Sequence, residues 1–297
     1  MEAHHLDIVY AYVQYCIETK EVRYSKFHRW YKPFNRKQST FRLLNRAVEE
    51  RIIFPPRIFC IQKVKAELVE HKKVPLVDQF EKISSHEDTF YALLLLGAHS
   101  LLYFSRSDTE TNLKYAKCIF PSYPQKKEIQ NIDPCLHEPE KLPVMTPPEW
   151  SSFDWKVFQK RRDPTESSTK IGRALGVSHR KILDSYWRIL KDCTIWVPFF
   201  PMGYRNYTQY YLSFETEYET GFVEELKKID RSSYVYKIDD TMLLNLFFEK
   251  RLEIDSILQL EKKGIIHDLR VSSPMYSFER FQSQQGIPDP APSPNKV

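Results

Sequence analysis

The feature that most constrains the fold is a segment near the middle of the chain where two helical patterns meet at one glycine. Residues 168–175 form a short helical pattern, Gly176 can adopt the left-handed backbone of a tight turn, and Ser178 is a suitable N-cap for the next helix. The apolar stripe of that next helix consists of Ile182, Leu183, Tyr186, Ile189 and Leu190. With an earlier helical stripe at 153–158, the segment predicts a helix-turn-helix.

Beyond this segment the apolar period changes from helical spacing to alternation. The expected order is strand 210–214, helix 222–229, strand 234–238, strand 244–248, helix 254–258 and strand 265–271. This β-α-β-β-α-β order is the plan of a ferredoxin-like domain.

The first half of the chain repeats this order with weaker signals. Its expected elements are helices at 6–18, 24–32 and 36–52, a strand at 61–70, a helix at 76–83 and a hairpin of 90–96 and 100–105. The hairpin turns at Gly97, and a capping box of Ser107 and Glu110 predicts one more helix. We therefore expect an α+β protein with tandem winged helix-turn-helix and ferredoxin-like (βαββαβ) modules, internally duplicated.

Proline is concentrated between the two halves, where residues 121–149 hold seven of the nineteen prolines. Neither helical nor strand periodicity survives there, which predicts a linker. The expected domains are a first winged helix-turn-helix at 1–58, a first ferredoxin-like domain at 59–133, a Pro-rich linker at 134–149, a second winged helix-turn-helix at 150–206, a second ferredoxin-like domain at 207–282 and a disordered tail at 283–297.

The charge of the chain is unevenly distributed. Residues 20–51 contain ten Lys or Arg against three Asp or Glu, and residues 156–192 contain ten against four. Because the whole chain carries a formal charge of only +5, the remainder is acidic. Two concentrated basic regions can neutralise phosphates and release their counterions, so they favour double-stranded DNA as a partner.

The candidate DNA-binding side chains lie on the third helix of each expected helix-turn-helix, whose first residues reach base edges or phosphates. In the second half they are Ser178, His179, Arg180, Lys181 and Arg188. In the first half they are Arg36, Lys37, Gln38, Arg42 and Arg46.

Several function classes are disfavoured by the sequence. The seven glycines form no phosphate-cradling loop, and no apolar run is long enough to cross a membrane. The five cysteines form no Cys-x-x-Cys pair and are expected to be buried thiols, while the histidines lack ligand spacing. Without a signal peptide, we expect a cytoplasmic protein with no metal and no cofactor.

The second half resembles the Lrp/AsnC (feast/famine) transcriptional regulators. The resemblance rests on the turn Ile-Gly-Arg-Ala-Leu-Gly-Val-Ser at 171–178, a hydrophobic strand beginning at Thr194, and the βαββαβ module ending in Ile-Ile-His-Asp-Leu-Arg-Val at 265–271. It implies a DNA-binding winged helix-turn-helix and a ferredoxin-like domain that senses a small-molecule effector such as an amino acid. Because that domain packs in pairs in the family, two copies in one chain imply an intramolecular pseudo-dimer and allow further homo-oligomers.

The resemblance places DNA contact on Ser178, Arg180 and Lys181. The first half lacks the Leu-Gly-Val-Ser turn and has Lys-Pro-Phe-Asn-Arg at 32–36 instead. The resemblance therefore implies DNA contact less directly for the third helix of the first half. The main prediction is a sequence-specific DNA-binding regulator that is not an enzyme.

Two alternatives remain. Sirohaem decarboxylases share the two-module architecture, but they would need histidine and basic side chains in the ferredoxin-like cleft to hold tetrapyrrole carboxylates. The outward residues expected on the second-half strands are Tyr, Ser, Asn, Lys237 and Glu215, with little histidine or arginine. The other alternative is a protein-interaction scaffold whose helix-turn-helix no longer contacts DNA.

Overall fold

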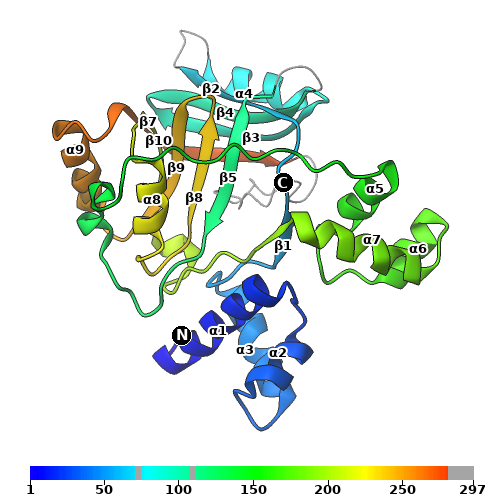
Figure 1. The fold of residues 1–297 in the computed structure, drawn as a ribbon. Coiled ribbons are helices and arrows are strands. Elements are labelled where there is room, and N and C mark those ends of the chain that lie inside the picture. The colour runs from blue at the N-terminus through cyan, green and yellow to red at the C-terminus, as the bar shows by residue number, and fades with distance from the viewer. Residues whose placement is uncertain (71–74, 108–110, 280–297) are drawn as a thin grey trace. The chain divides into compact units, whose positions relative to one another are not determined.

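The computed structural model describes residues 1–70, 75–107 and 111–279. It divides into two compact units, each built from two separate stretches of chain (Figure 1). Unit 1 consists of Met1–Cys60 and Pro147–Tyr204, and unit 2 consists of Ile61–Thr146 and Arg205–Val297. Segments that are distant in sequence are therefore joined within each unit.

Unit 1 contains two sets of three helices and a short strand from each half of the chain. The helices are α1 (Ala3–Thr19), α2 (Tyr24–Tyr31), α3 (Lys37–Glu49), α5 (Ser152–Lys160), α6 (Ser168–Leu175) and α7 (His179–Asp192). Strands β1 (Arg57–Phe59) and β6 (Thr194–Trp196) pair antiparallel, with Ile58 opposite Ile195. The rings of Phe59 and Trp196 stack with their centroids 4.0 Å apart, so this strand pair connects the two stretches of unit 1.

The third helix of the first set is shorter than the sequence predicts. It ends at Glu49 rather than near residue 52, because Arg51 has a left-handed backbone with φ of 53°. The turn directs Ile52 and Ile53 into the core, where Ile53 forms a bridge with Phe199.

Unit 2 is built on an eight-stranded antiparallel sheet with the order β2-β4-β3-β10-β7-β9-β8-β5. The strands are β2 (Val64–Glu70), β3 (Thr89–Gly97), β4 (His99–Arg106), β5 (Leu113–Ile119), β7 (Thr208–Glu215), β8 (Ser233–Ile238), β9 (Thr241–Phe248) and β10 (His267–Glu279). The other elements are helices α4 (Leu76–Ser85), α8 (Glu219–Leu226) and α9 (Asp255–Lys262), and the 3-10 turns η1 (Ile129–Asn131), η2 (Pro134–Leu136) and η4 (Arg251–Ile254). The 3-10 turn η3 (Tyr204–Asn206) spans the boundary between the two units.

The mixed α+β class expected from the sequence is confirmed. In the second half the elements β7, α8, β8, β9, α9 and β10 follow one another, and their strands lie in the order β10-β7-β9-β8. Strand β10 is much longer than the expected strand at 265–271, because it continues past β7 and pairs with β3 as well. The expected tail at 283–297 lies outside the described residues.

The prediction of a helix after Ser107 is wrong for the residues that the structure describes. Residues 108–110, including the Glu110 of the capping box, lie outside them, and residues 113–119 form strand β5 instead. Strand β5 pairs antiparallel with β8, and this pairing places Cys118 opposite Tyr234. The pairing partner lies over a hundred residues later in the chain, so local spacing could not indicate this strand.

The sheet curls so that strands that are not neighbours approach one another. The ring centroids of Phe104 in β4 and Tyr236 in β8 are 6.0 Å apart. The side chain of Asn112 connects the two edge strands, since its amide accepts from Ala66 N at 2.8 Å and donates to Ala66 O at 2.9 Å. We call the concave side the inner face; the opposite face packs on α8 and α9 around Leu212, Leu244 and Phe222 (Figure 1).

The Pro-rich segment before residue 147 is fastened to unit 2 through two buried carboxylates of α8. Glu225, whose side chain is fully buried, pairs with Lys127, Lys228 and His137 and accepts from Asp133 N at 3.1 Å. Glu219 accepts from the amine of Lys237 at 2.7 Å and from Leu142 N at 2.7 Å. The segment expected as a linker thus forms part of the packed structure.

The pKa of Glu225 reports the strength of this attachment. Burial raises the pKa, but hydrogen bonds from Lys127, Lys228, Asp133 N and His137 together lower it to about 2. Since an unfolded Glu has a pKa of about 4.3, the ionised side chain stabilises the folded state fully above roughly pH 5, and this contribution is lost as the pH falls toward 2.

We expect Glu225→Gln to lower the free energy of unfolding at pH 7 by about 1–3 kcal/mol, because charged hydrogen bonds are replaced by weaker neutral ones. The difference from the parent protein should shrink between roughly pH 5 and pH 2. Denaturant unfolding at a series of pH values measures this. Glu224→Gln on the same helix is the control, since that side chain is half exposed and pairs only with Lys227 among the described residues. An equal loss in both variants would contradict the assignment.

Candidate functional site

The helix-turn-helix expected at 168–192 is present in unit 1. Gly176 ends α6 with a left-handed backbone (φ 66°), and Ser178 caps α7 by accepting from Lys181 N at 3.3 Å. A Cβ atom on Gly172 would lie 2.8 Å from the carbonyl oxygen of Val177, so this glycine lets the turn approach α6 closely. The local sequence signals and the structure therefore agree at this corner.

The predicted residues of α7 fall into two environments. His179, Arg180 and Lys181 are exposed in the first turn, with the Lys181 amine 4.7 Å from the ring centroid of Phe153. Arg188 is more than half exposed, but its guanidinium donates to Asp154 Oδ1 at 2.8 Å. The first turn of α7 thus presents two cations without an acidic partner among the described residues, whereas Arg188 is partly neutralised.

Asp154 links α5 to α7 from a buried position. Burial raises the pKa of this carboxyl, but hydrogen bonds from Ser185, Ser151 and Arg188 outweigh that effect and lower the pKa. Arg188 therefore holds the helix in place as well as contributing surface charge.

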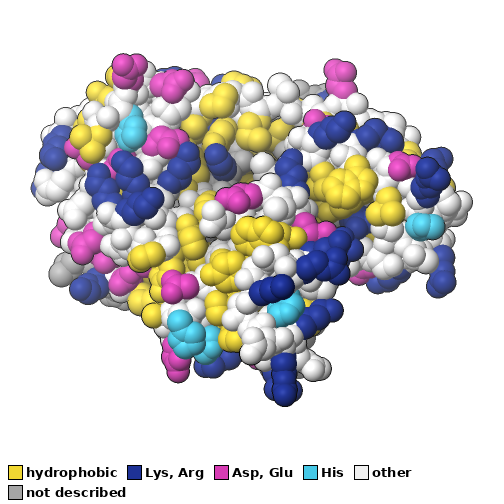
Figure 2. Space-filling model, turned by 60° about the horizontal axis from the view of Figure 1, so that its bottom comes forward, with side chains coloured by type: hydrophobic (Ala, Val, Ile, Leu, Met, Phe, Trp, Pro, Cys, Tyr) yellow, Lys and Arg dark blue, Asp and Glu magenta, His cyan; other side chains and the backbone are white. Residues whose placement is uncertain are grey.

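The first-half candidates gather on α3. All the candidates on or directly before this helix are exposed: Arg36, Lys37, Gln38, Arg42 and Arg46. Arg46 donates to Glu50 at 2.5 Å, and the amine of Lys37 lies 5.1 Å from the ring centroid of Phe41. Figure 2, which brings the side of the structure with α1–α3 forward, shows Lys and Arg side chains on this surface.

A second polar region, which the sequence did not indicate, lies on the inner face of the sheet in unit 2. His99 begins β4 and is buried, and its Nε2 is 2.8 Å from Ser213 Oγ in β7. The His99 backbone N–H donates to Ser272 Oγ at 2.9 Å. Gly97, two residues earlier, has φ of 139°, and a Cβ there would lie 2.4 Å from Val271 O. The close approach of the hairpin to β10 thus places the histidine against β7.

A chain of polar side chains continues from this point along the inner face. Gln209 Nε2 donates to Asn245 Oδ1 at 3.0 Å, and Asn245 Nδ2 donates to Tyr211 Oη at 3.1 Å. Two further polar atoms, His99 Nδ1 and Tyr236 Oη, are buried with no hydrogen-bond partner among the described residues. Buried polar atoms of this kind are uncommon in folded proteins, so each calls for an explanation.

The end of the inner face near His99 carries an ion pair between β2 and β10. Arg270 lies opposite Ser213 in the strand register, and its guanidinium pairs with Glu70. Burial lowers the pKa of His99, and the charge of Arg270 lowers it further, while Glu70 acts in the opposite direction. A buried histidine and an arginine–glutamate ion pair therefore lie at the same end of the inner face.

These residues can perform a limited set of reactions. Arg270 can bind a carboxylate through two parallel hydrogen bonds, and His99 can donate or accept a proton at a buried position. The buried aromatic rings of Phe104 and Tyr236 contact each other on the same inner face, with their centroids 6.0 Å apart.

The sequence did not identify this region, because its members come from different parts of the chain. His99 lies in a hairpin of the first half and Arg270 in the last strand of the second. Lys237, which the sequence places among the outward residues of its strand, lies instead on the helical face, where its amine binds Glu219. Adjacent positions on a strand point to opposite faces, so the inner-face residue is Tyr236.

Among the described residues, no helix is long and apolar enough to cross a membrane.

Comparison with known proteins bears on the fold. No protein-family model matches the sequence, and no curated protein matches it. The architecture is a mixed α+β arrangement. A solved structure that shares it is that of the siroheme decarboxylase NirDL, with a TM-score of 0.53 and 8% sequence identity, over 93% of this chain and 92% of that chain. At 8% sequence identity, this structural similarity shows that the two proteins share a fold.

The comparison also corrects one expectation. The sequence led us to expect that the chain is not an enzyme, but a solved protein that shares this fold, the siroheme decarboxylase NirDL, is an enzyme. The architecture therefore gives no reason to exclude catalysis.

We expect Arg270→Gln to raise the pKa of His99, because a nearby positive charge is removed, although burial should still hold it below the usual value of about 6.5. Glu70→Gln should lower it. Titration of the histidine ring signals by NMR measures both shifts, with the exposed His267 as an internal control. A His99 signal that does not respond to either change would show that Arg270 does not act on it.

Proposed function

We propose that this chain is a decarboxylase of a carboxylated tetrapyrrole of the siroheme type, and that the reaction takes place on the inner face of unit 2. The observation that carries the proposal is the buried His99 beside Ser213, with the exchangeable Arg270–Glu70 pair at the same end of the face. The fold shared with a siroheme decarboxylase supports it.

The roles of the residues follow from the chemistry of decarboxylation. Loss of CO2 from a side chain breaks a carbon–carbon bond and leaves an electron pair that must take up a proton. In the proposal, Arg270 leaves Glu70 and binds a substrate carboxylate that is retained, while His99 takes up a proton from solvent and, as the imidazolium, passes it to the reacting carbon. Phe104 and Tyr236 contact the ring system of the substrate and exclude water.

The proposal includes an internal duplication. Each half of the chain contributes a helical set to unit 1 and strands to the sheet of unit 2, so the two halves act as a pseudo-dimer within one chain. In this reading the two halves have diverged, since His99 comes from one and Arg270 from the other.

The test is titration of the full chain with siroheme, followed by visible absorption, and incubation followed by mass spectrometry for loss of CO2. His99→Ala should lower kcat by about 10²–10⁴-fold, as expected for loss of a proton donor, with little change in binding. Arg270→Ala should chiefly raise KM. His267→Ala, at an exposed position of β10, is the matched control. Absence of a spectral change and of product with the parent protein would refute the proposal.

A second function, DNA binding by unit 1, is favoured by one specific observation. The exposed His179, Arg180 and Lys181 stand in the first turn of α7, on a helix-turn-helix corner with the required glycine and cap. This is the position from which such a helix contacts base edges and phosphates. Under this proposal the chain shares with Lrp/AsnC regulators a duplex-binding unit, and the exposed α3 residues Arg36, Lys37, Gln38, Arg42 and Arg46 supply a weaker second contact.

We expect Arg180→Ala and Lys181→Ala each to weaken binding to duplex DNA. A base contact should cost about 1–3 kcal/mol, and a phosphate contact should make the dependence of log K on log salt shallower by about one unit. Fluorescence anisotropy with duplexes selected from a random pool measures this at several salt concentrations. Lys191→Ala, at the exposed C-terminal end of α7, is the control. Unchanged affinity in both test variants would remove DNA contact from this helix.

A further inference from the structure

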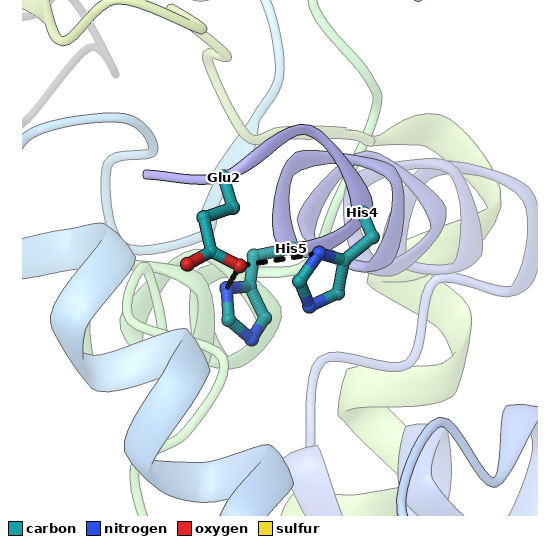
Figure 3. A group of neighbouring side chains, drawn as sticks. All are labelled: Glu2, His4 and His5. Carbon is teal, nitrogen blue, oxygen red and sulfur yellow. Dashed lines mark ion pairs between the residues drawn. The ribbon is translucent and has the colours of Figure 1, made fainter.

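Three side chains with metal-binding atoms converge at the beginning of α1 (Figure 3). Glu2 directly precedes the helix, and His4 and His5 lie in its first turn. The Nδ1 atoms of His4 and His5 are 3.4 and 4.0 Å from Glu2 Oε2, and one ligand atom from each residue lies within 4.8 Å of the other two. Sequence spacing did not group these residues, since adjacent histidines alone have no ligand spacing.

The separations match those of ligands around a small divalent ion. Metal–nitrogen and metal–oxygen bonds of about 2.0–2.2 Å in a tetrahedral site place neighbouring ligand atoms roughly 3.3–3.5 Å apart. The distance of 3.4 Å from His4 Nδ1 to Glu2 Oε2 already has this value, and the distance of 4.0 Å from His5 Nδ1 is longer. Two imidazoles and one carboxylate leave at least one coordination position for water.

The backbone and the neighbouring rings hold the group in place. His5 N and Leu6 N donate to the carbonyl oxygen of Glu2 at 3.0 and 3.1 Å. The ring centroids of His4 and His5 are 4.0 Å apart, and His5 also lies 6.3 Å from the ring of Phe34. The helix start therefore fixes the backbone of Glu2 relative to that of His5, and the two imidazole rings lie side by side.

The charges near the group also favour a cation. In the part of the chain that the structure describes, the Glu2 carboxylate pairs with these two imidazoles and with no lysine or arginine. The first turn of a helix disfavours a cation, and the negative charge of Glu2 offsets this effect. No competing cation needs to be displaced for a metal to bind.

We propose that Glu2, His4 and His5 form a binding site for a divalent transition metal of the zinc class. Imidazole nitrogen favours Zn²⁺, Co²⁺ or Ni²⁺ over Mg²⁺ and Ca²⁺, which prefer all-oxygen ligand sets. The site belongs to unit 1 and is independent of the inner face of unit 2.

The first experiment is titration of the full chain with Zn²⁺ by calorimetry and with Co²⁺ by visible absorption, where coordinated nitrogen ligands produce a d–d band. We expect saturable binding of one ion, which requires neutral imidazoles and is therefore lost in acid, and no binding of Mg²⁺. No saturable Zn²⁺ or Co²⁺ binding, or Mg²⁺ binding at the same site, would overturn the proposal.

Variants identify the ligands. His4→Ala, His5→Ala and Glu2→Gln should each weaken Zn²⁺ binding by at least about tenfold, while His267→Ala should leave it unchanged. Because Glu2 and His4 are mostly exposed, those two variants should retain the parent circular dichroism spectrum. Unchanged Zn²⁺ affinity in Glu2→Gln and His4→Ala, or an equal loss in His267→Ala, would assign the ion to other residues.

Discussion

The arrangement of unit 2 depends on the double pairing of strand β10. Its first residues pair with β7 and its later residues pair with β3, so one strand joins the sheet portions contributed by the two halves of the chain. Without that strand, the β7–β9–β8 portion and the β3–β4–β2 portion would have no shared hydrogen bonds at this point. The proximity of His99 to Ser213 and of Glu70 to Arg270 follows from this pairing, since each contact crosses between the two portions.

The opposite edges of the sheet are constrained in a different way. Strand β5, from the first half, pairs with β8 of the second half, and Asn112 just before β5 returns to β2 through its side-chain amide. One amide that both donates to and accepts from the same backbone residue reproduces the hydrogen bonding of a strand neighbour. The concave shape of the inner face therefore results from long-range pairing at both ends of the strand order, and its polar side chains are brought together by the same pairings.

The sequence predicted those parts of the structure that depend on local spacing. The turn at Gly176, the cap at Ser178 and the apolar stripe of α7 involve residues within two helical turns of one another, and the structure has them as expected. Strand β5 and the length of β10 depend on partners in the other half, so a capping-box pattern predicted a helix in place of β5, and periodicity predicted a shorter strand for β10. His99 and Arg270 were missed for the same reason: each is unremarkable in its own segment, and only the tertiary pairing makes them neighbours.

The two proposed functions place the basic side chains of this protein in different physical settings. Arg180 and Lys181 are exposed, so their attraction to phosphates acts through water and is screened over about 8 Å at physiological ionic strength. His99 is buried, and its pKa is set first by burial and then by Arg270. Steep salt dependence is therefore expected of phosphate binding by the helical surface of unit 1, whereas a step that uses the proton of the buried His99 should depend on pH. The two units can be distinguished by this physical property even where one chain carries both activities.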